Sequence, residues 1–144
     1  MASRRAIDRV FQYIPDGLPW VLSSNKNLGC FMAKSYTEIN QEQRQFGSAY
    51  RKASPDTMNA FLALHKAAMC EGELSVKHKE LIATAIAIAA RCDGCIGAHV
   101  AAALKAGASK QELIETIDVA VLMGGGPAVI YGTQALAAVE ELAG

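Results

Sequence analysis

Residues 80–99, ELIATAIAIAARCDGCIGAH, contain both the most apolar helical segment of this chain and its most reactive side chains. Thr84 is the only polar side chain from Leu81 to Ala90, and a helix that is apolar on every side is typical of the centre of a bundle. This pattern predicts a buried central helix. After an interruption at Asp93-Gly94, a second helix is expected from Cys95 to Ala106.

The segments on either side also carry helix signals, and none shows the sustained alternation of Val, Ile and Thr that is typical of strands. A polar helix is expected from Thr37 to Arg51. The next helix is expected from Pro55 to about Cys70, with proline in its first position. These elements predict an all-α protein, in which residues 1–50 form an N-terminal arm and residues 51–144 form the helical domain.

Capping residues mark the remaining helix ends. Ser75 is the expected N-cap of the central helix, with His78 where a complete capping box has Glu or Gln. Ser109 and Glu112 form a complete capping box, which predicts a helix to about Met123. The segment 124–127, Gly-Gly-Gly-Pro, is then expected to end that helix and to start a last one that reaches about Leu142.

Composition limits the classes of function. The 144 residues include 14 Lys or Arg and 14 Asp or Glu, so no basic field favours nucleic acid or an anionic membrane. The start of the chain does not resemble a signal peptide, and Leu81–Ala90 is about half as long as a bilayer span, so we expect a cytoplasmic protein. The apolar fraction of 51% indicates surplus apolar helix surface, which favours homo-oligomers. Trp20 and Phe31 indicate that the arm also packs on another surface.

Cys92, Cys95 and His99 follow one another at steps of three and four residues, which brings side chains to one side of a helix. Cys95 is expected in the first helical turn, where free N–H groups favour a thiolate, and His99 is placed to take the thiol proton. We therefore predict Cys95 as the attacking sulfur and Cys92 as the resolving sulfur. If the two helices pack together, the Glu80 carboxylate would extend a proton relay to His99.

Other interpretations of these residues stay open from the sequence alone. The two cysteines could be ordinary core thiols, and Glu80 could be a solvated glutamate in a first helical turn. Zinc would suit Cys92, Cys95 and His99, but a fourth ligand is not evident, and no metal or cofactor is expected. A thioredoxin domain is disfavoured because its Cys-x-x-Cys follows a strand. A phosphate loop at 124–126 would lack the preceding strand and the P-loop lysine.

The pattern E-x11-C-x2-C-x3-H, formed by Glu80, Cys92, Cys95 and His99, resembles the core of the alkylhydroperoxidase D-like proteins in the carboxymuconolactone decarboxylase superfamily. The flanking segments 74–82, 102–108, 112–115 and 123–127 are also similar to that family. The resemblance covers roughly residues 55–142 and leaves the first 50 residues unmatched.

The resemblance implies an all-helical fold that assembles into trimers or hexamers, with sites near the subunit contacts. It also implies thiol peroxidase or disulfide-exchange activity through the four motif residues. Alkylhydroperoxidase D itself often has a histidine or another larger side chain where Gly94 lies, so this chain lacks one possible member of the relay. The true decarboxylases generally lack the cysteine pair, and its presence here favours redox chemistry over lactone decarboxylation.

These inferences predict an enzyme that reduces hydroperoxides. Cys95 would become a sulfenic acid, Cys92 would condense with it to a disulfide, and an external dithiol or protein donor would restore both thiols. Two alternatives are a protein that exchanges disulfides with little peroxidase activity, and a non-enzymatic oligomer that senses redox state.

Overall fold

The computed structural model describes residues 35–144, so Trp20 and Phe31 lie outside the described residues. The described part is helical and has no strand, which confirms the all-α class. Residues 35–144 lie within one compact unit. The helices are α2 (Tyr36–Ala53), α3 (Pro55–Met69), α4 (Val76–Ala89), α5 (Asp93–Lys105) and α6 (Lys110–Leu142).

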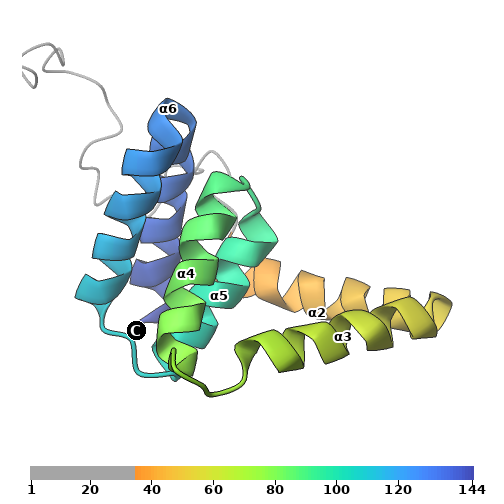
Figure 1. The fold of residues 1–144 in the computed structure, drawn as a ribbon. Coiled ribbons are helices and arrows are strands. Elements are labelled where there is room, and N and C mark those ends of the chain that lie inside the picture. The colour runs from red at the N-terminus through yellow and green to blue at the C-terminus, as the bar shows by residue number, and fades with distance from the viewer. Residues whose placement is uncertain (1–34) are drawn as a thin grey trace, which may run out of the picture. The chain divides into compact units, whose positions relative to one another are not determined.

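α4, α5 and α6 pack together as a bundle, and α2 and α3 extend from it (Figure 1). The core of the bundle consists of side chains that point between these three helices. Its largest fully buried members are Ile88, Ile96, Leu113, Val100, Val139 and Thr84.

α4 is buried on one side only, which corrects the prediction of a helix enclosed on all sides. Ile82 and Ile86 are 49% and 61% exposed, whereas Thr84 is fully buried. Thr84 satisfies its hydroxyl by donating a hydrogen bond to the Glu80 carbonyl oxygen at 2.9 Å. Within residues 35–144, α5 and α6 cover one side of α4 and leave its other apolar side exposed.

The joint between α4 and α5 is a tight backbone turn, and it lies before the Asp93-Gly94 pair. Arg91 has a φ of 58°, its N–H donates to the Ile88 carbonyl oxygen, and the Cys92 N–H donates to the Ala87 carbonyl oxygen, both at 3.1 Å. This pair of bonds is the Schellman arrangement, in which the left-handed residue is most often glycine. α5 therefore begins at Asp93, two residues earlier than predicted.

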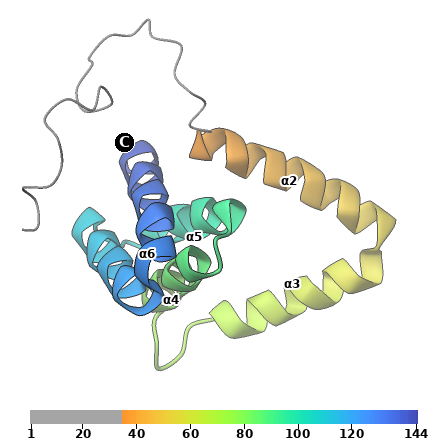
Figure 2. The ribbon, with the colours of Figure 1, turned by 90° about the horizontal axis from the view of Figure 1, so that it is seen from above.

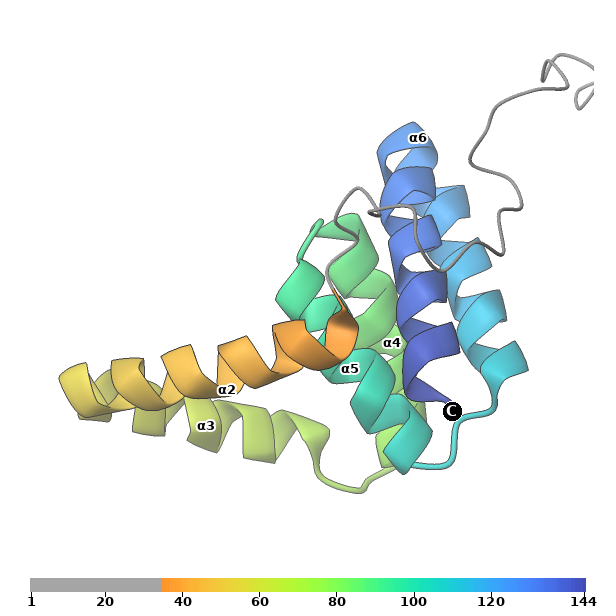
Figure 3. The same ribbon diagram turned by 180° about the vertical axis from the view of Figure 1, so that it is seen from behind.

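α6 contains two antiparallel halves, 110–124 and 126–142, joined at Gly125 (Figure 3). Gly125 has φ 63° and ψ −151°, a backbone region that is essentially restricted to glycine. The predicted break at residues 124–127 is therefore confirmed, as is the capping box of Ser109 and Glu112. A methyl group at Gly132 would lie 3.1 Å from Ile117 and Val121, so the halves approach closely there.

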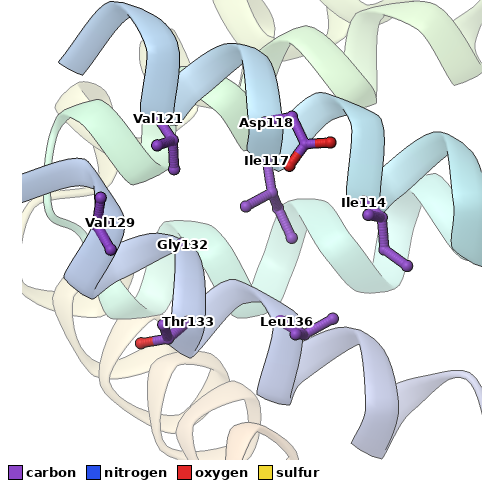
Figure 4. A pocket seen from close by; sticks show the side chains of 8 residues that line it. All are labelled: Ile114, Ile117, Asp118, Val121, Val129, Gly132, Thr133 and Leu136. Carbon is purple, nitrogen blue, oxygen red and sulfur yellow. The ribbon is translucent and has the colours of Figure 1, made fainter. Parts of the chain in front are cut away.

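An open apolar groove of about 190 Å³ follows the line between the two halves of α6 (Figure 4). By length and composition alone, α6 would suffice to cross a membrane. However, the reversal at Gly125 leaves halves that each rise about 22–26 Å, less than the roughly 30 Å of a hydrocarbon core.

α2 and α3 meet near Ser54 and spread apart toward the bundle (Figure 2). The first turns of α2 pack on α5, whereas α3 buries none of its side chains within the described part of the chain. Phe61 and Leu64 on α3 are 58% and 65% exposed. The predicted bounds of both helices are confirmed to within two residues, but the apolar side chains of α3 remain exposed within residues 35–144.

Candidate active site

The cysteine pair lies at the N-terminus of α5, because the turn after α4 makes Cys92 the N-cap residue. Cys95 follows in the first helical turn, as predicted. The two sulfurs are bonded as a disulfide, with their Cα atoms 5.2 Å apart, and the Cys95 N–H donates to Cys92 Sγ at 3.2 Å. Both residues are half-buried. Free N–H groups at a helix start stabilise negative charge, so this position favours the thiolate of either cysteine after reduction.

Glu80 and His99 form the second pair. Glu80 Oε2 on α4 lies 2.7 Å from His99 Nδ1 on α5, without an intervening group. Glu80 is 5% exposed, so it is not a solvated surface glutamate. In the neutral tautomer whose Nδ1 donates to this carboxylate, Nε2 keeps a free lone pair. The carboxylate thus orients the ring, whose side chain is still 25% exposed.

The structure joins the four motif residues as two pairs rather than one chain of hydrogen bonds. Within residues 35–144, no hydrogen bond connects the His99 ring with Cys92 or Cys95, which are bonded to each other. His99 nevertheless follows Cys95 by one helical turn on α5. The arrangement brings a disulfide at a helix N-terminus close to a histidine that a buried carboxylate orients.

Cys70 and His78 make their hydrogen bonds outside this site. Cys70 is an exposed free thiol whose sulfur donates to the Ala67 carbonyl oxygen. His78 contacts the Ser75 hydroxyl at 2.7 Å, next to the cap of α4. In the part of the chain that the structure describes, no group of three or more His, Cys, Asp or Glu side chains is arranged to hold a metal ion.

Sequence reasoning missed the contribution of α2, whose Tyr36 and Asn40 cover α5. Asn40 Nδ2 donates to the Gly97 carbonyl oxygen at 3.0 Å. Tyr36 is 5% exposed; burial, assisted by the carboxylates of Asp93 and Glu141, raises its pKa to about 12. The available signal was the spacing of Tyr36 and Asn40 by one helical turn, in a segment that otherwise reads as polar.

Comparison with known sequences assigns the family. The model of the carboxymuconolactone decarboxylase family matches residues 55–141. An uncharacterised protein of Cupriavidus necator is 42% identical over 106 residues, which are 74% of this chain and 90% of the relative. An uncharacterised protein of the cox locus of Paracoccus denitrificans is 38% identical over 93 residues, which are 65% of this chain and 84% of the relative.

Solved structures agree with this assignment. A carboxymuconolactone decarboxylase family protein of Legionella pneumophila has a TM-score of 0.73 and 41% identity, with 76% of this chain and 97% of that one covered. A family protein of Thermotoga maritima, for which a role in the antioxidative response has been suggested, has a TM-score of 0.66 and 28% identity, with 74% and 90% covered. The chain therefore belongs to the carboxymuconolactone decarboxylase family and has its alkylhydroperoxidase D-like fold.

Proposed function

We propose that this protein is a thiol-dependent hydroperoxide reductase. The observation that carries the proposal is the combination of Cys92 and Cys95 at the start of α5 with a histidine one turn later, which Glu80 holds at 2.7 Å. The suggested antioxidative role of the Thermotoga maritima relative points in the same direction. We further propose a cytoplasmic location, where cellular dithiols are kept reduced.

In the first step, His99 takes the thiol proton of reduced Cys95 through Nε2. The buried Glu80 carboxylate stabilises the imidazolium that forms, and the N-terminus of α5 stabilises the thiolate. The thiolate sulfur attacks the terminal oxygen of R–O–O–H and breaks the O–O bond. Cys95 becomes a sulfenic acid, and the departing alkoxide takes the proton from His99 and leaves as an alcohol.

In the second step, the thiol of Cys92 condenses with the sulfenic acid of Cys95, which forms the disulfide and releases water. An external dithiol then attacks Cys95, and Cys92 leaves as a thiolate. A hydrogen bond to Cys92 Sγ, like the one that the Cys95 N–H donates at 3.2 Å, favours that leaving group. Oxidation of the donor to its own disulfide balances reduction of the pair.

Consumption of a hydroperoxide in the presence of dithiothreitol tests the proposal on the wild type, Cys95→Ser and His99→Ala. We expect turnover by the wild type, none by Cys95→Ser and a strongly reduced rate for His99→Ala. Equal rates in all three proteins would refute it. Reduction of a model disulfide without peroxide turnover would instead identify a disulfide-exchange protein.

We also propose that the protein acts as a homo-oligomer, a trimer or a hexamer. Ile86 on α4 and Val119, Leu122 and Met123 on α6 are 56–81% exposed, and they surround or adjoin an open apolar pocket. Apolar patches of this kind usually mark protein contacts. Light scattering should show assembly of the wild type and its loss in Leu122→Glu; a monomeric wild type would overturn the proposal.

A further inference from the structure

Hydrogen bonds hold the N-terminal end of α2 against the bundle. The Glu141 carboxylate accepts hydrogen bonds from the Ser35 hydroxyl at 2.6 Å, from the Tyr36 N–H at 2.8 Å and from the Thr37 N–H at 3.0 Å. Together with the Asn40 bond to α5, these contacts fix both the position and the rotation of the helix. The face of α2 that meets the cysteine-bearing helix is therefore determined by the fold.

That face continues to Gln43, which follows Asn40 by three residues and lies against Gly94, between the two cysteines. A methyl group at Gly94 would lie 3.2 Å from both Cγ and Cδ of Gln43, and 3.5 Å from its amide nitrogen. The Gln43 side chain is exposed, and its amide makes no hydrogen bond to any residue from 35 to 144. Within residues 35–144, its N–H groups are thus free to bond another molecule beside Gly94.

Resting on the function proposed above, we propose that Gln43 contacts the substrate by donating an amide hydrogen bond to the leaving oxygen of the hydroperoxide. As the thiolate of Cys95 forms its bond to the terminal oxygen, negative charge develops on the oxygen that becomes the alkoxide. A hydrogen bond donated to that oxygen is stronger in the transition state, where the oxygen carries more negative charge, than in the ground state. Such a bond therefore accelerates the step. His99 then supplies the proton that makes the alcohol.

This assignment also gives Gly94 a function. A side chain at this position would occupy the space where the Gln43 side chain contacts the first turn of α5. The glycine therefore leaves room for the Gln43 amide, which belongs to a different helix, α2. α2 lies outside residues 55–141, the part that matches the family model. Gln43 therefore lies outside the part of the chain that the family model describes.

Stopped-flow kinetics of the full-length protein test this inference in two separate half-reactions: oxidation of the reduced protein by tert-butyl hydroperoxide, and reduction of the disulfide by dithiothreitol. Removal of a hydrogen-bond donor from a fully enclosed oxyanion site lowers the rate constant by about 100-fold. At an exposed site, water replaces part of the lost hydrogen bond. We therefore expect Gln43→Ala to slow oxidation about 10-fold. Dithiothreitol reduction forms no alkoxide and should stay within about twofold of the wild type. Gln41→Ala, an exposed glutamine on the same helix, is the matched control and should match the wild type in both.

Gly94→Ala gives a second variant, because its methyl group displaces Gln43. It should slow oxidation in the wild type but add nothing in the Gln43→Ala background. Oxidation of Gln43→Ala at the rate of Gln41→Ala, or equal slowing of both half-reactions, would overturn the inference while leaving the proposed function standing. A wild type that reacts with peroxide no faster than Cys95→Ser would overturn both.

Discussion

Replacement of Glu80 by glutamine isolates the charge in the site, because glutamine has nearly the same shape and keeps an oxygen that can accept from His99 Nδ1. Glu80 is 5% exposed and lies 2.7 Å from the ring, so water screens the interaction little. A charge-assisted hydrogen bond contributes about 1.5–3 kcal/mol and a neutral one about 0.5–1.5 kcal/mol. Loss of the charge should therefore raise the barrier by about 1–2 kcal/mol, which slows peroxide oxidation about 5- to 30-fold.

The assay is the second-order rate constant for oxidation of the reduced protein, with Glu115→Gln, an exposed glutamate on α6, as the matched control. Urea unfolding should show that Glu80→Gln remains folded, since a neutral amide replaces a buried charge. A rate for Glu80→Gln within twofold of the Glu115→Gln rate would refute the reasoning that the carboxylate stabilises an imidazolium.

Three further predictions concern the backbone and the caps. Arg91→Gly should raise the free energy of unfolding by up to about 1 kcal/mol in urea titrations, because glycine adopts the left-handed conformation without the side-chain clash. Gly125→Ala should lower it by about 1–3 kcal/mol, since no neighbouring atom lies within 4 Å of the added methyl group and the cost is one of backbone strain alone; Gly126→Ala is the control that should show no such loss. The Ser35 hydroxyl and the N–H groups at the start of α2 lower the pKa of Glu141 to about 2 from 4.5, so the stability it adds should be complete above pH 4.5 and lost as the pH falls toward 2. In Glu141→Gln, the urea midpoint should depend less on pH across that range. A pH dependence equal to that of the wild type would contradict the assignment of this stability to Glu141.

The helix pattern was predictable because the signals that set it are local. Ser75, Pro55, the Ser109 capping box and the glycines at 124–126 each act within a few residues, and α3 and α6 follow them closely. α5 begins at Asp93, two residues before the start that the sequence predicts. The turn that ends α4 uses an arginine in a left-handed conformation, and only a glycine there would have marked it in the sequence.

The site residues that lie on one helix were predictable from their spacing. The contacts that form where two helices pack together were less predictable. The spacing of Cys92, Cys95 and His99 follows from helical geometry, whereas the contact of Glu80 with His99 depends on how α4 packs on α5. Burial on α4 was misjudged for a similar reason, since composition could not tell that Ile86 is exposed and Thr84 enclosed. The approach of α2 to Gly94 depends on long-range bonds to Glu141, for which the sequence carries no local signal.

Trapping of the sulfenic acid in a Cys92→Ser variant tests the central claim most directly. Once Cys92 can no longer condense with it, the oxidised sulfur should persist at Cys95 and react with dimedone, and mass spectrometry after hydroperoxide treatment should locate the adduct there. The reciprocal variant, Cys95→Ser, should yield little adduct at Cys92. Adduct formation at Cys92 in Cys95→Ser, with none at Cys95 in Cys92→Ser, would contradict the account.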